Sequence, residues 1–274
     1  MTRPLWRRVG GRAKRALHRL ATPIDRLARW KDPALLPPAH LRIYYYRTSK
    51  PSAYAHACEV ARTELVTRGL QPHHRVLDIG SGIGNLALGL SDYLRGGYDG
   101  IEIHPEAVAW CQRAITPRHP AFRFHRADLA SHAYNPKGRA SASGYRFPFP
   151  DRAFDCIFLS SVFTHMLPEG VEHYVREIAR LLAPEGMCVE SFFLLNPETM
   201  AGVDRGASFM RFDVPHASGV CRLHDADVPE AAIAFDEGFV RRIHEGAGLR
   251  IRDIRRGRWW CGEAHDQDVL TVGF

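Results

Sequence analysis

The sequence predicts an α/β fold built on a mostly parallel sheet with helices on both faces. Two observations indicate it. Apolar segments that read as strands alternate with helical segments from about residue 76 to residue 196, which is typical of strands joined by crossover helices. A glycine-rich turn separates the first predicted strand from the helix that follows it. With 274 residues, 45% of them hydrophobic, the chain is long enough to bury the core that such a sheet needs.

Residues 1–31 form a basic segment unlike the rest of the chain. They hold ten Lys or Arg residues and one acid, Asp25, which leaves 27 basic and 29 acidic residues elsewhere and a net charge of −2 there. Apolar residues recur in this segment every three or four positions, so we expect a basic amphipathic helical tail. Such a helix can make peripheral contact with an anionic membrane, or pack on the body or on a partner. No aromatic stacking platform accompanies the charge, and we expect no nucleic-acid partner.

Residues 32–71 are expected to connect this tail to the body as a linker and an N-terminal helix or lid. The stretch 32–52 is rich in proline and then in tyrosine. The stretch 53–69 is predicted to be a helix that ends at Gly69. Four tyrosines could close over a bound cofactor or could simply pack against the body: Tyr44, Tyr45, Tyr46 and Tyr54.

A strand, a glycine turn and the start of a helix follow one another in the run Val76-Leu77-Asp78-Ile79-Gly80-Ser81-Gly82-Ile83-Gly84-Asn85. The glycines permit positive φ angles and a close approach of a ligand to the backbone. The helix that follows directs its unpaired N–H groups toward the turn. This arrangement is typical of a nucleotide-binding turn.

Two acids stand at the ends of the strands predicted next. The predicted strands span 98–103, 122–125, 155–160 and 187–195, and the helices between them span 105–115 and 169–182. Glu102 lies at the end of the first of these strands, and Asp128 follows the second. Ligands of parallel sheets bind beyond the carboxyl ends of the strands, so both acids are expected near the glycine turn.

Two stretches interrupt the alternation and are expected to be insertions. Residues 129–150 and 197–235 are rich in polar and turn-forming residues, and both are predicted to be irregular. The second, over 197–230, is a candidate lid or substrate region. A helix over 236–248 and two strands, 249–255 and 269–274, complete the prediction.

Four motifs, in this order, resemble those of the class I S-adenosylmethionine-dependent methyltransferases. They are the glycine turn, Gly100-Ile101-Glu102-Ile103, Arg126-Ala127-Asp128-Leu129, and residues 149–157 with Leu182-Ala183-Pro184-Glu185-Gly186. The resemblance covers residues 72–196 closely and the C-terminal strands loosely. It implies a Rossmann-like fold, a mostly parallel seven-stranded sheet with helices on both faces and an antiparallel last strand. The methyltransferase domain would span residues 72–274.

The resemblance also implies S-adenosylmethionine as the cofactor and suggests how it is held. Glu102 would accept the ribose hydroxyls, and Asp128 the exocyclic amine of adenine. The glycine turn would hold the methionine part, with Asp78 ordering the turn or meeting the ammonium group. The predicted cofactor-binding residues are Asp78, Gly80, Ser81, Gly82, Gly84, Asn85, Glu102, Ile103, Asp128, Leu129 and Ser160.

Methylation of a hydroxyl requires that a base remove its proton, and His165 is the candidate for this role. His165 follows the fourth strand of the sheet, where substrate and cofactor would meet, and Glu169 could orient it if the turn between them is helical. Helix capping or packing is the other role open to His165. We therefore expect an enzyme that methylates a small-molecule acceptor, preferably a hydroxyl of a sugar or secondary metabolite. No metal-ligand spacing is recognised.

Two other functions are considered. A non-catalytic nucleotide-fold module, tethered by its basic N-terminal helix, would bind the cofactor without turnover. An NAD(P)-dependent oxidoreductase would need a glycine where the chain has Asn85. The six cysteines are scattered, and neither a membrane span nor a signal peptide is recognised, so we expect a cytoplasmic protein. The oligomeric state is not predicted.

Overall fold

The computed structural model describes residues 33–131, 134–262 and 266–274. Its main sheet has seven strands in the order β10-β11-β5-β4-β1-β2-β3. The strands are β1 (Val76–Ile79), β2 (Tyr98–Glu102), β3 (Phe122–Arg126), β4 (Phe154–Leu159), β5 (Leu182–Phe192), β10 (Arg250–Arg255) and β11 (Asp268–Gly273). The first five are parallel, and β11 runs antiparallel to both β5 and β10. The predicted fold class is confirmed, including the antiparallel last strand.

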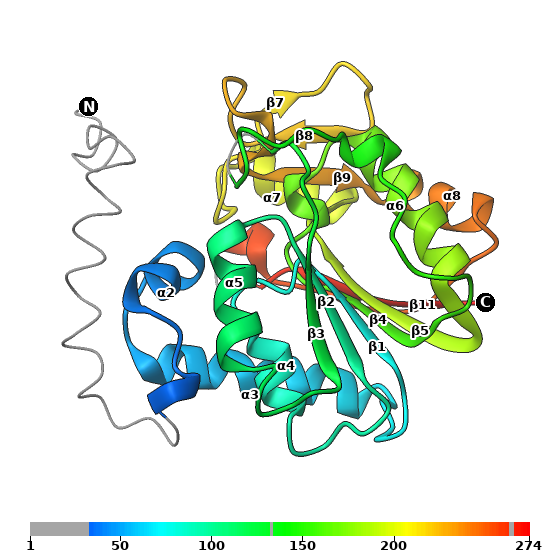
Figure 1. Cartoon of the computed structure of the whole chain (residues 1–274). Helices are drawn as coiled ribbons and strands as arrows, with labels where there is room; N and C mark the ends of the chain where they lie inside the picture. Colours follow the sequence, from blue (N-terminus) through cyan, green and yellow to red (C-terminus); the bar gives the residue numbers. More distant parts are fainter. Residues whose placement is uncertain (1–32, 132–133, 263–265) are drawn as a thin grey trace.

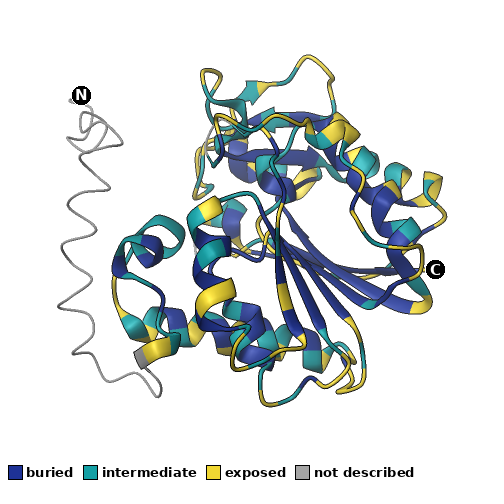
Figure 2. Ribbon diagram, in the orientation of Figure 1, coloured by how far each residue is buried: buried dark blue, intermediate teal, exposed yellow. Residues whose placement is uncertain are grey.

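Helices cover both faces of this sheet (Figure 1). The helices α3 (Pro51–Thr67), α4 (Asn85–Leu90) and α5 (Pro105–Ala114) pack on one face, while α6 (Pro168–Leu181) and α8 (Glu237–Gly246) pack on the other. Alternate residues of one strand therefore enter different cores: Val76 packs with α3 to α5, and Leu77 packs with α6. Figure 2 shows the strands buried between the two helical layers. Burial on both faces explains why these strands read as unbroken apolar runs.

The predicted linker contains a helix of its own. After the short 3₁₀ turn η2 (Pro33–Leu35), helix α2 (Ala39–Tyr46) begins directly behind Pro38. Arg42 is 1% exposed, and its guanidinium donates to the carbonyl oxygens of Pro37 and Ser49 at the two ends of this segment. Burial lowers the pKa of Arg42 to about 10. The segment is thus folded onto the body, and the predicted helix over 53–69 is present as α3.

Residues 197–235 were expected to be irregular, and this expectation is wrong. They contain α7 (Pro197–Asp204), β7 (Val214–Pro215), β8 (Cys221–Leu223) and the 3₁₀ turn η5 (Pro229–Ala231). β9 (Ile233–Asp236) and β6 (Leu194–Leu195) complete a second sheet in the order β6-β9-β8-β7. These strands have two to four residues each, which is too short for an alternating pattern to show in the sequence. Helix α7 is only eight residues long, but its start is well defined, since Asn196 and Thr199 form a reciprocal capping box.

The remaining elements are short 3₁₀ turns beside the sheet. They are η3 (Ala142–Gly144), η4 (Phe163–His165) and η6 (Trp259–Cys261). The stretch 129–150 is otherwise without helix or ladder strand among its described residues and carries two isolated bridges, Leu129 to Ala140 and Ser131 to Asn135. The predicted basic tail at 1–31 lies outside the described residues. Within the described ranges, no helix is both long and apolar enough to cross a bilayer.

Candidate active site

The glycine turn lies between the end of β1 and the start of α4, beside the end of β2. Gly80, Gly82 and Gly84 have φ angles of +79°, +53° and +75°. The N–H groups of Gly80 and Ser81 both donate to the carbonyl of Ile101, at 2.8 and 2.9 Å, which binds the turn to β2. A β-carbon placed on Gly84 would lie 2.5 Å from Cδ1 of Ile115 and 3.2 Å from Sγ of Cys111. Both its backbone angle and its surroundings therefore require glycine at position 84.

Glu102 ends β2 with its carboxylate turned into the glycine turn. The side chain accepts hydrogen bonds from three backbone N–H groups, those of Gly82 at 2.8 Å, Ile103 at 2.7 Å and His104 at 2.8 Å. It is 6% exposed, and burial raises its pKa despite the opposing effect of these donors. Oε1 already accepts two of these hydrogen bonds and Oε2 accepts one, so one acceptor site remains on Oε2 for a ribose hydroxyl.

The donor and acceptor groups of the turn suit a nucleoside bound beyond the strand ends. Ser81 is 2% exposed, and its hydroxyl meets no hydrogen-bond partner among the described residues. A buried hydroxyl without a partner is costly in a folded protein and is a candidate ligand contact. Together with Glu102, it provides one hydroxyl and one carboxylate at the same end of the sheet. The residues present therefore fit the predicted cofactor.

Asp78 faces away from the ligand side of the turn. It is 3% exposed, and its Oδ2 accepts from the Tyr98 hydroxyl at 2.5 Å. Burial raises the pKa of Asp78 to about 7. This hydrogen bond joins Asp78 to the start of β2, and both roles predicted for this acid stay predictions.

Asp128 follows β3 and is held by its own loop. Oδ2 accepts from Arg139 Nε at 2.7 Å, and Oδ1 accepts from Arg126 at 3.0 Å and Asn135 at 3.3 Å. These donors hold its pKa below the usual range. Its side chain keeps 28% exposure and one free lone pair on Oδ2 for an amine donor. Leu129, next in the chain, is 4% exposed and packs in the α6 core beside Ile103.

Tyrosines of the N-terminal segment contact the turn. A β-carbon placed on Gly82 would lie 3.3 Å from Cε1 of Tyr45, so this ring covers the turn at that glycine. The Tyr54 hydroxyl donates to the Ile83 carbonyl at 2.7 Å, and Tyr46 packs on Tyr54 with ring centroids 6.1 Å apart. The Tyr44 ring packs against that of Tyr134, with ring centroids 6.0 Å apart, so these tyrosines form an aromatic layer. Helices α2 and α3 therefore close one side of the site.

His165 lies in η4, at the other end of this aromatic layer. Its ring stands 5.5 Å from that of Tyr134, and its Nδ1 lies 3.0 Å from the carbonyl oxygen of Glu230 in η5. Burial lowers the pKa of His165. The predicted partner, Glu169, is exposed in the first turn of α6, and no described contact joins it to His165. The orienting group is a backbone carbonyl 65 residues away in sequence, which no local spacing could have indicated.

Two of the predicted cofactor-binding residues have no polar side-chain partner among the described residues. Asn85 begins α4 and is half-buried, while Ser160 follows β4 and is exposed. Neither makes a side-chain hydrogen bond to a described residue. Within the described ranges, no group of three or more His, Cys, Asp or Glu side chains could hold a metal ion.

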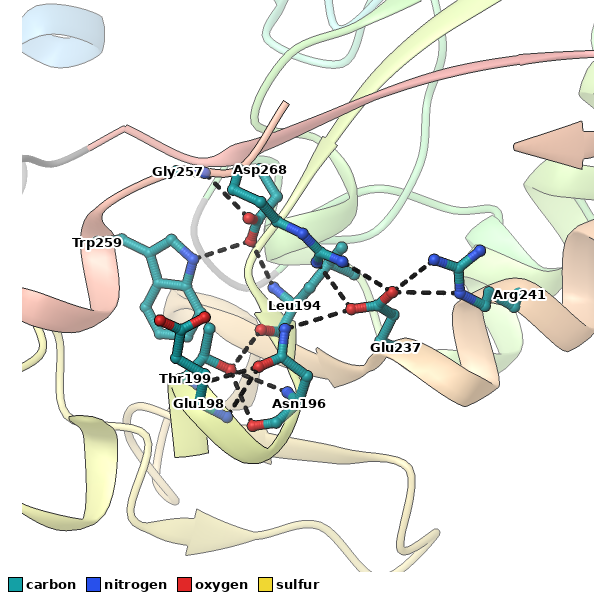
Figure 3. Close-up of polar contacts among 10 residues, drawn as sticks. Leu194, Asn196, Glu198, Thr199, Glu237, Arg241, Gly257, Trp259 and Asp268 are labelled. Atoms are coloured by element: carbon teal, nitrogen blue, oxygen red, sulfur yellow. Dashed lines mark hydrogen bonds and ion pairs between the residues drawn. The ribbon is translucent and has the colours of Figure 1, made fainter. Parts of the chain in front are cut away.

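A network missed by the sequence analysis joins the second sheet to the main sheet (Figure 3). Asp268, at the start of β11, is 1% exposed and accepts from the N–H groups of Leu194 at 2.9 Å, Gly257 at 3.0 Å and the Trp259 indole at 2.9 Å. Beside it, Glu237 accepts from Arg241, Arg256 and Asn196, and these donors lower its pKa to about 2. The network thereby ties β6 and the start of α8 to β11.

Comparisons with known proteins agree with this geometry. Residues 77–189 match the family model described as a methyltransferase domain. A solved protein from Pyrococcus horikoshii OT3 is similar at 14% identity and a TM-score of 0.56, over 84% of this chain and 94% of that one. A TehB-like S-adenosylmethionine-dependent methyltransferase from Corynebacterium glutamicum is similar at 16% identity and a TM-score of 0.50, over 86% of this chain and 99% of that one.

A third solved structure contains ligands. It is the 1,6-didemethyltoxoflavin-N1-methyltransferase from Burkholderia thailandensis, with bound 1,6-didemethyltoxoflavin and S-adenosylhomocysteine. The likeness has 18% identity and a TM-score of 0.52, over 87% of each chain. At these identities the solved structures establish the shared fold, while the matched domain and the ordered motifs carry the assignment. Residues 77–189 therefore form a methyltransferase domain of the class I S-adenosylmethionine-dependent kind, and S-adenosylmethionine is its cofactor.

Proposed function

We propose that the protein transfers the methyl group to a hydroxyl of a small molecule, of the sugar or secondary-metabolite class, with His165 as general base. The observation that carries this proposal is the contact between His165 Nδ1 and the Glu230 carbonyl. A carbonyl oxygen can only accept a hydrogen bond, so Nδ1 must carry the proton. The neutral ring then has a free lone pair on Nε2, which is the form that a general base requires.

The electrostatics of His165 suit the same role. Burial lowers its pKa, and the nearby positive charge of Arg47 acts in the same direction. The ring is therefore neutral at physiological pH and able to accept a proton. A hydroxyl loses its proton to Nε2 as the new carbon–oxygen bond forms, and the electron pair of the broken carbon–sulfur bond stays with sulfur.

The other site residues bind and orient the cofactor in this proposal. Bound at the turn, the cofactor supplies a methyl group on a positively charged sulfur. Glu102 accepts from its ribose, Asp128 from its adenine amine, and Gly80, Gly82 and Ser81 contact its methionine part. Tyr44, Tyr45 and Tyr134 cover the site and exclude water from it. The 1,6-didemethyltoxoflavin bound in the similar methyltransferase from Burkholderia thailandensis supports a small-molecule acceptor here.

Replacing His165 tests the base. We expect His165→Asn to lower kcat by roughly 10²- to 10⁴-fold, the usual contribution of a general base, with an unchanged Kd for S-adenosylhomocysteine. Turnover would be followed on a panel of methyl glycosides and phenols, with aromatic amines as nitrogen acceptors. Because burial lowers the pKa of His165, the wild-type rate should stay level down to below pH 6.5 and then fall as the base is protonated.

The matched control is His56→Asn, which changes an exposed histidine on α3 and should leave the rate as it is. If the rate of His165→Asn still falls at low pH as the wild-type rate does, His165 is not the base. Methylation of the amines alone would replace the hydroxyl by a nitrogen acceptor. Cofactor binding without turnover on any panel member would favour the non-catalytic module.

A further inference from the structure

Three side chains form a closed ring of hydrogen bonds beyond the ends of β4 and β5. The Ser191 hydroxyl donates to Oε1 of Gln267 at 2.6 Å, and Nε2 of Gln267 donates to the Ser161 hydroxyl oxygen at 2.9 Å. The backbone N–H of Ser161 closes the ring by donating to the Ser191 hydroxyl oxygen at 2.9 Å. Residues from three strand ends, separated by up to 106 positions, are thus held in one arrangement.

The directions of these bonds leave two hydrogens without an acceptor among the described residues, the second amide hydrogen of Gln267 and the hydroxyl hydrogen of Ser161. Ser191 donates its single O–H to Gln267, and the Gln267 amide donates one N–H to Ser161. Ser161 accepts in its turn, so its own O–H has no acceptor among the described residues. Ser161 is exposed, whereas Ser191 behind it is 6% exposed. The ring therefore presents one oriented hydroxyl donor on its open side.

The backbone of Ser161 is held in an unfavourable conformation. Its φ angle is +56°, one of three positive values among the non-glycine residues described. This conformation costs an L-residue on the order of 1 kcal/mol, and such residues concentrate at functional sites. A glycine would adopt it without that cost, so the side chain is the feature that distinguishes serine here.

The ring lies on the acceptor half of the site. Apart from Ser160 after β4, the predicted cofactor residues belong to the ends of β1, β2 and β3, whereas the ring belongs to β4, β5 and β11, on the opposite side of β1 in the sheet. Because β11 is antiparallel, its first residue Asp268 pairs with Phe192 at the end of β5, which brings Gln267 to the ligand edge. Val162 joins the two halves, since its Cγ2 would lie 2.5 Å from a β-carbon on Gly80.

We propose that Ser161 binds the methyl acceptor by donating a hydrogen bond to one of its oxygen atoms, with Gln267 as the positioning residue that orients the hydroxyl. This inference rests on the proposed function, because it places the acceptor between Ser161 and His165 on the segment that follows β4. The bonded oxygen is a second oxygen of the acceptor. A hydrogen bond donated to the reacting oxygen would withdraw electron density from it and lower its nucleophilicity. The methyl acceptor therefore belongs to the class of molecules with two neighbouring oxygens, such as a vicinal diol or a hydroxyl beside an ether or carbonyl.

The test compares Ser161→Ala, Ser161→Gly and Gln267→Glu with the wild type and with Ser52→Ala, an exposed serine on α3. We expect both Ser161 variants to raise the acceptor KM by about tenfold, the usual effect of one lost hydrogen bond, while the Kd for S-adenosylhomocysteine is unchanged. The glycine variant also relieves the positive φ, so equal effects of Ala and Gly would assign the loss to the hydroxyl. Gln267→Glu turns a donor into an acceptor that captures the Ser161 O–H, and KM should rise although Ser161 is present.

The panel contains methyl glycosides with free vicinal diols and the same glycosides with one oxygen of the pair removed. The KM effect of Ser161→Ala should be confined to the diols. A KM equal to that of the wild type, or a weaker Kd for S-adenosylhomocysteine, would overturn the proposal, the second by assigning Ser161 to the cofactor.

A second readout does not depend on turnover. In the S-adenosylhomocysteine complex, the side-chain amide signal of Gln267, identified by its loss in Gln267→Glu, should shift when a diol glycoside is added. The shift should be absent in Ser161→Ala. A shift without turnover would support the Ser161 site while rejecting the proposed reaction. No shift with any diol of the panel would reject the Ser161 site.

Discussion

Replacing Glu102 by alanine is expected to weaken binding of S-adenosylhomocysteine roughly a hundredfold. The variant removes a carboxylate whose remaining acceptor site on Oε2 would take a ribose hydroxyl, and one hydrogen bond to a charged group contributes up to about 3 kcal/mol. Glu102→Gln retains a single acceptor oxygen and should lose roughly tenfold. Isothermal titration calorimetry with S-adenosylhomocysteine measures both.

The control for this pair is Glu172→Ala, an exposed acid on α6. Glu102 also accepts three backbone N–H groups, so a melting curve must accompany each titration. If Glu102→Ala does not fold, the smaller loss of affinity for S-adenosylhomocysteine in Glu102→Gln still tests whether Glu102 binds the cofactor. Wild-type affinity in a folded Glu102 variant would show that the cofactor is held elsewhere.

Asp268→Ala is expected to give the largest loss of stability, roughly 3–5 kcal/mol in the free energy of unfolding. Three buried N–H groups, those of Leu194, Gly257 and the Trp259 indole, would lose their acceptor, and each buried donor without a partner costs about 1–3 kcal/mol. Asp268→Asn keeps one oxygen and should lose less. Urea unfolding monitored by tryptophan fluorescence measures the difference.

Asp92→Ala is the matched control, since Asp92 is a surface acid that pairs with Arg62. Its removal should change the free energy of unfolding by less than about 1 kcal/mol. Asp268 holds β6, which pairs with β9 a few residues after Glu230 in the chain, so the folded fraction of Asp268→Asn should show a reduced kcat with near-normal cofactor affinity. A loss of stability no greater than that of Asp92→Ala would mean that the network does not hold the two sheets together.

The positions of the glycine turn, Glu102 and Asp128 in the fold could be predicted from the sequence because their signals are local. The glycine turn, Glu102 and Asp128 each stand directly at the end of an apolar run, and parallel strands bring their carboxyl ends to one edge. The seven-stranded sheet followed from the same alternation together with the family resemblance. Even here the sequence left two roles open for Asp78, since only the position of Tyr98 shows which way that side chain points.

The acceptor half depends on contacts between distant segments, which the sequence does not reveal. Glu230 orients His165 across 65 residues, and Gln267 meets Ser161 across 106. Glu169, chosen for its helical spacing from His165, is not placed to orient it, because η4 ends and α6 begins between the two residues. The second sheet was missed because its strands are too short to show a period.

The most direct test of the account is a crystal structure of the protein with S-adenosylhomocysteine. We expect a ribose hydroxyl on the Glu102 carboxylate, the adenine amine at Asp128, and the sulfur facing the space between Ser161 and His165. A ligand bound away from the glycine turn would contradict it, as would a turn that stays covered by Tyr45 with no ligand at saturating concentration.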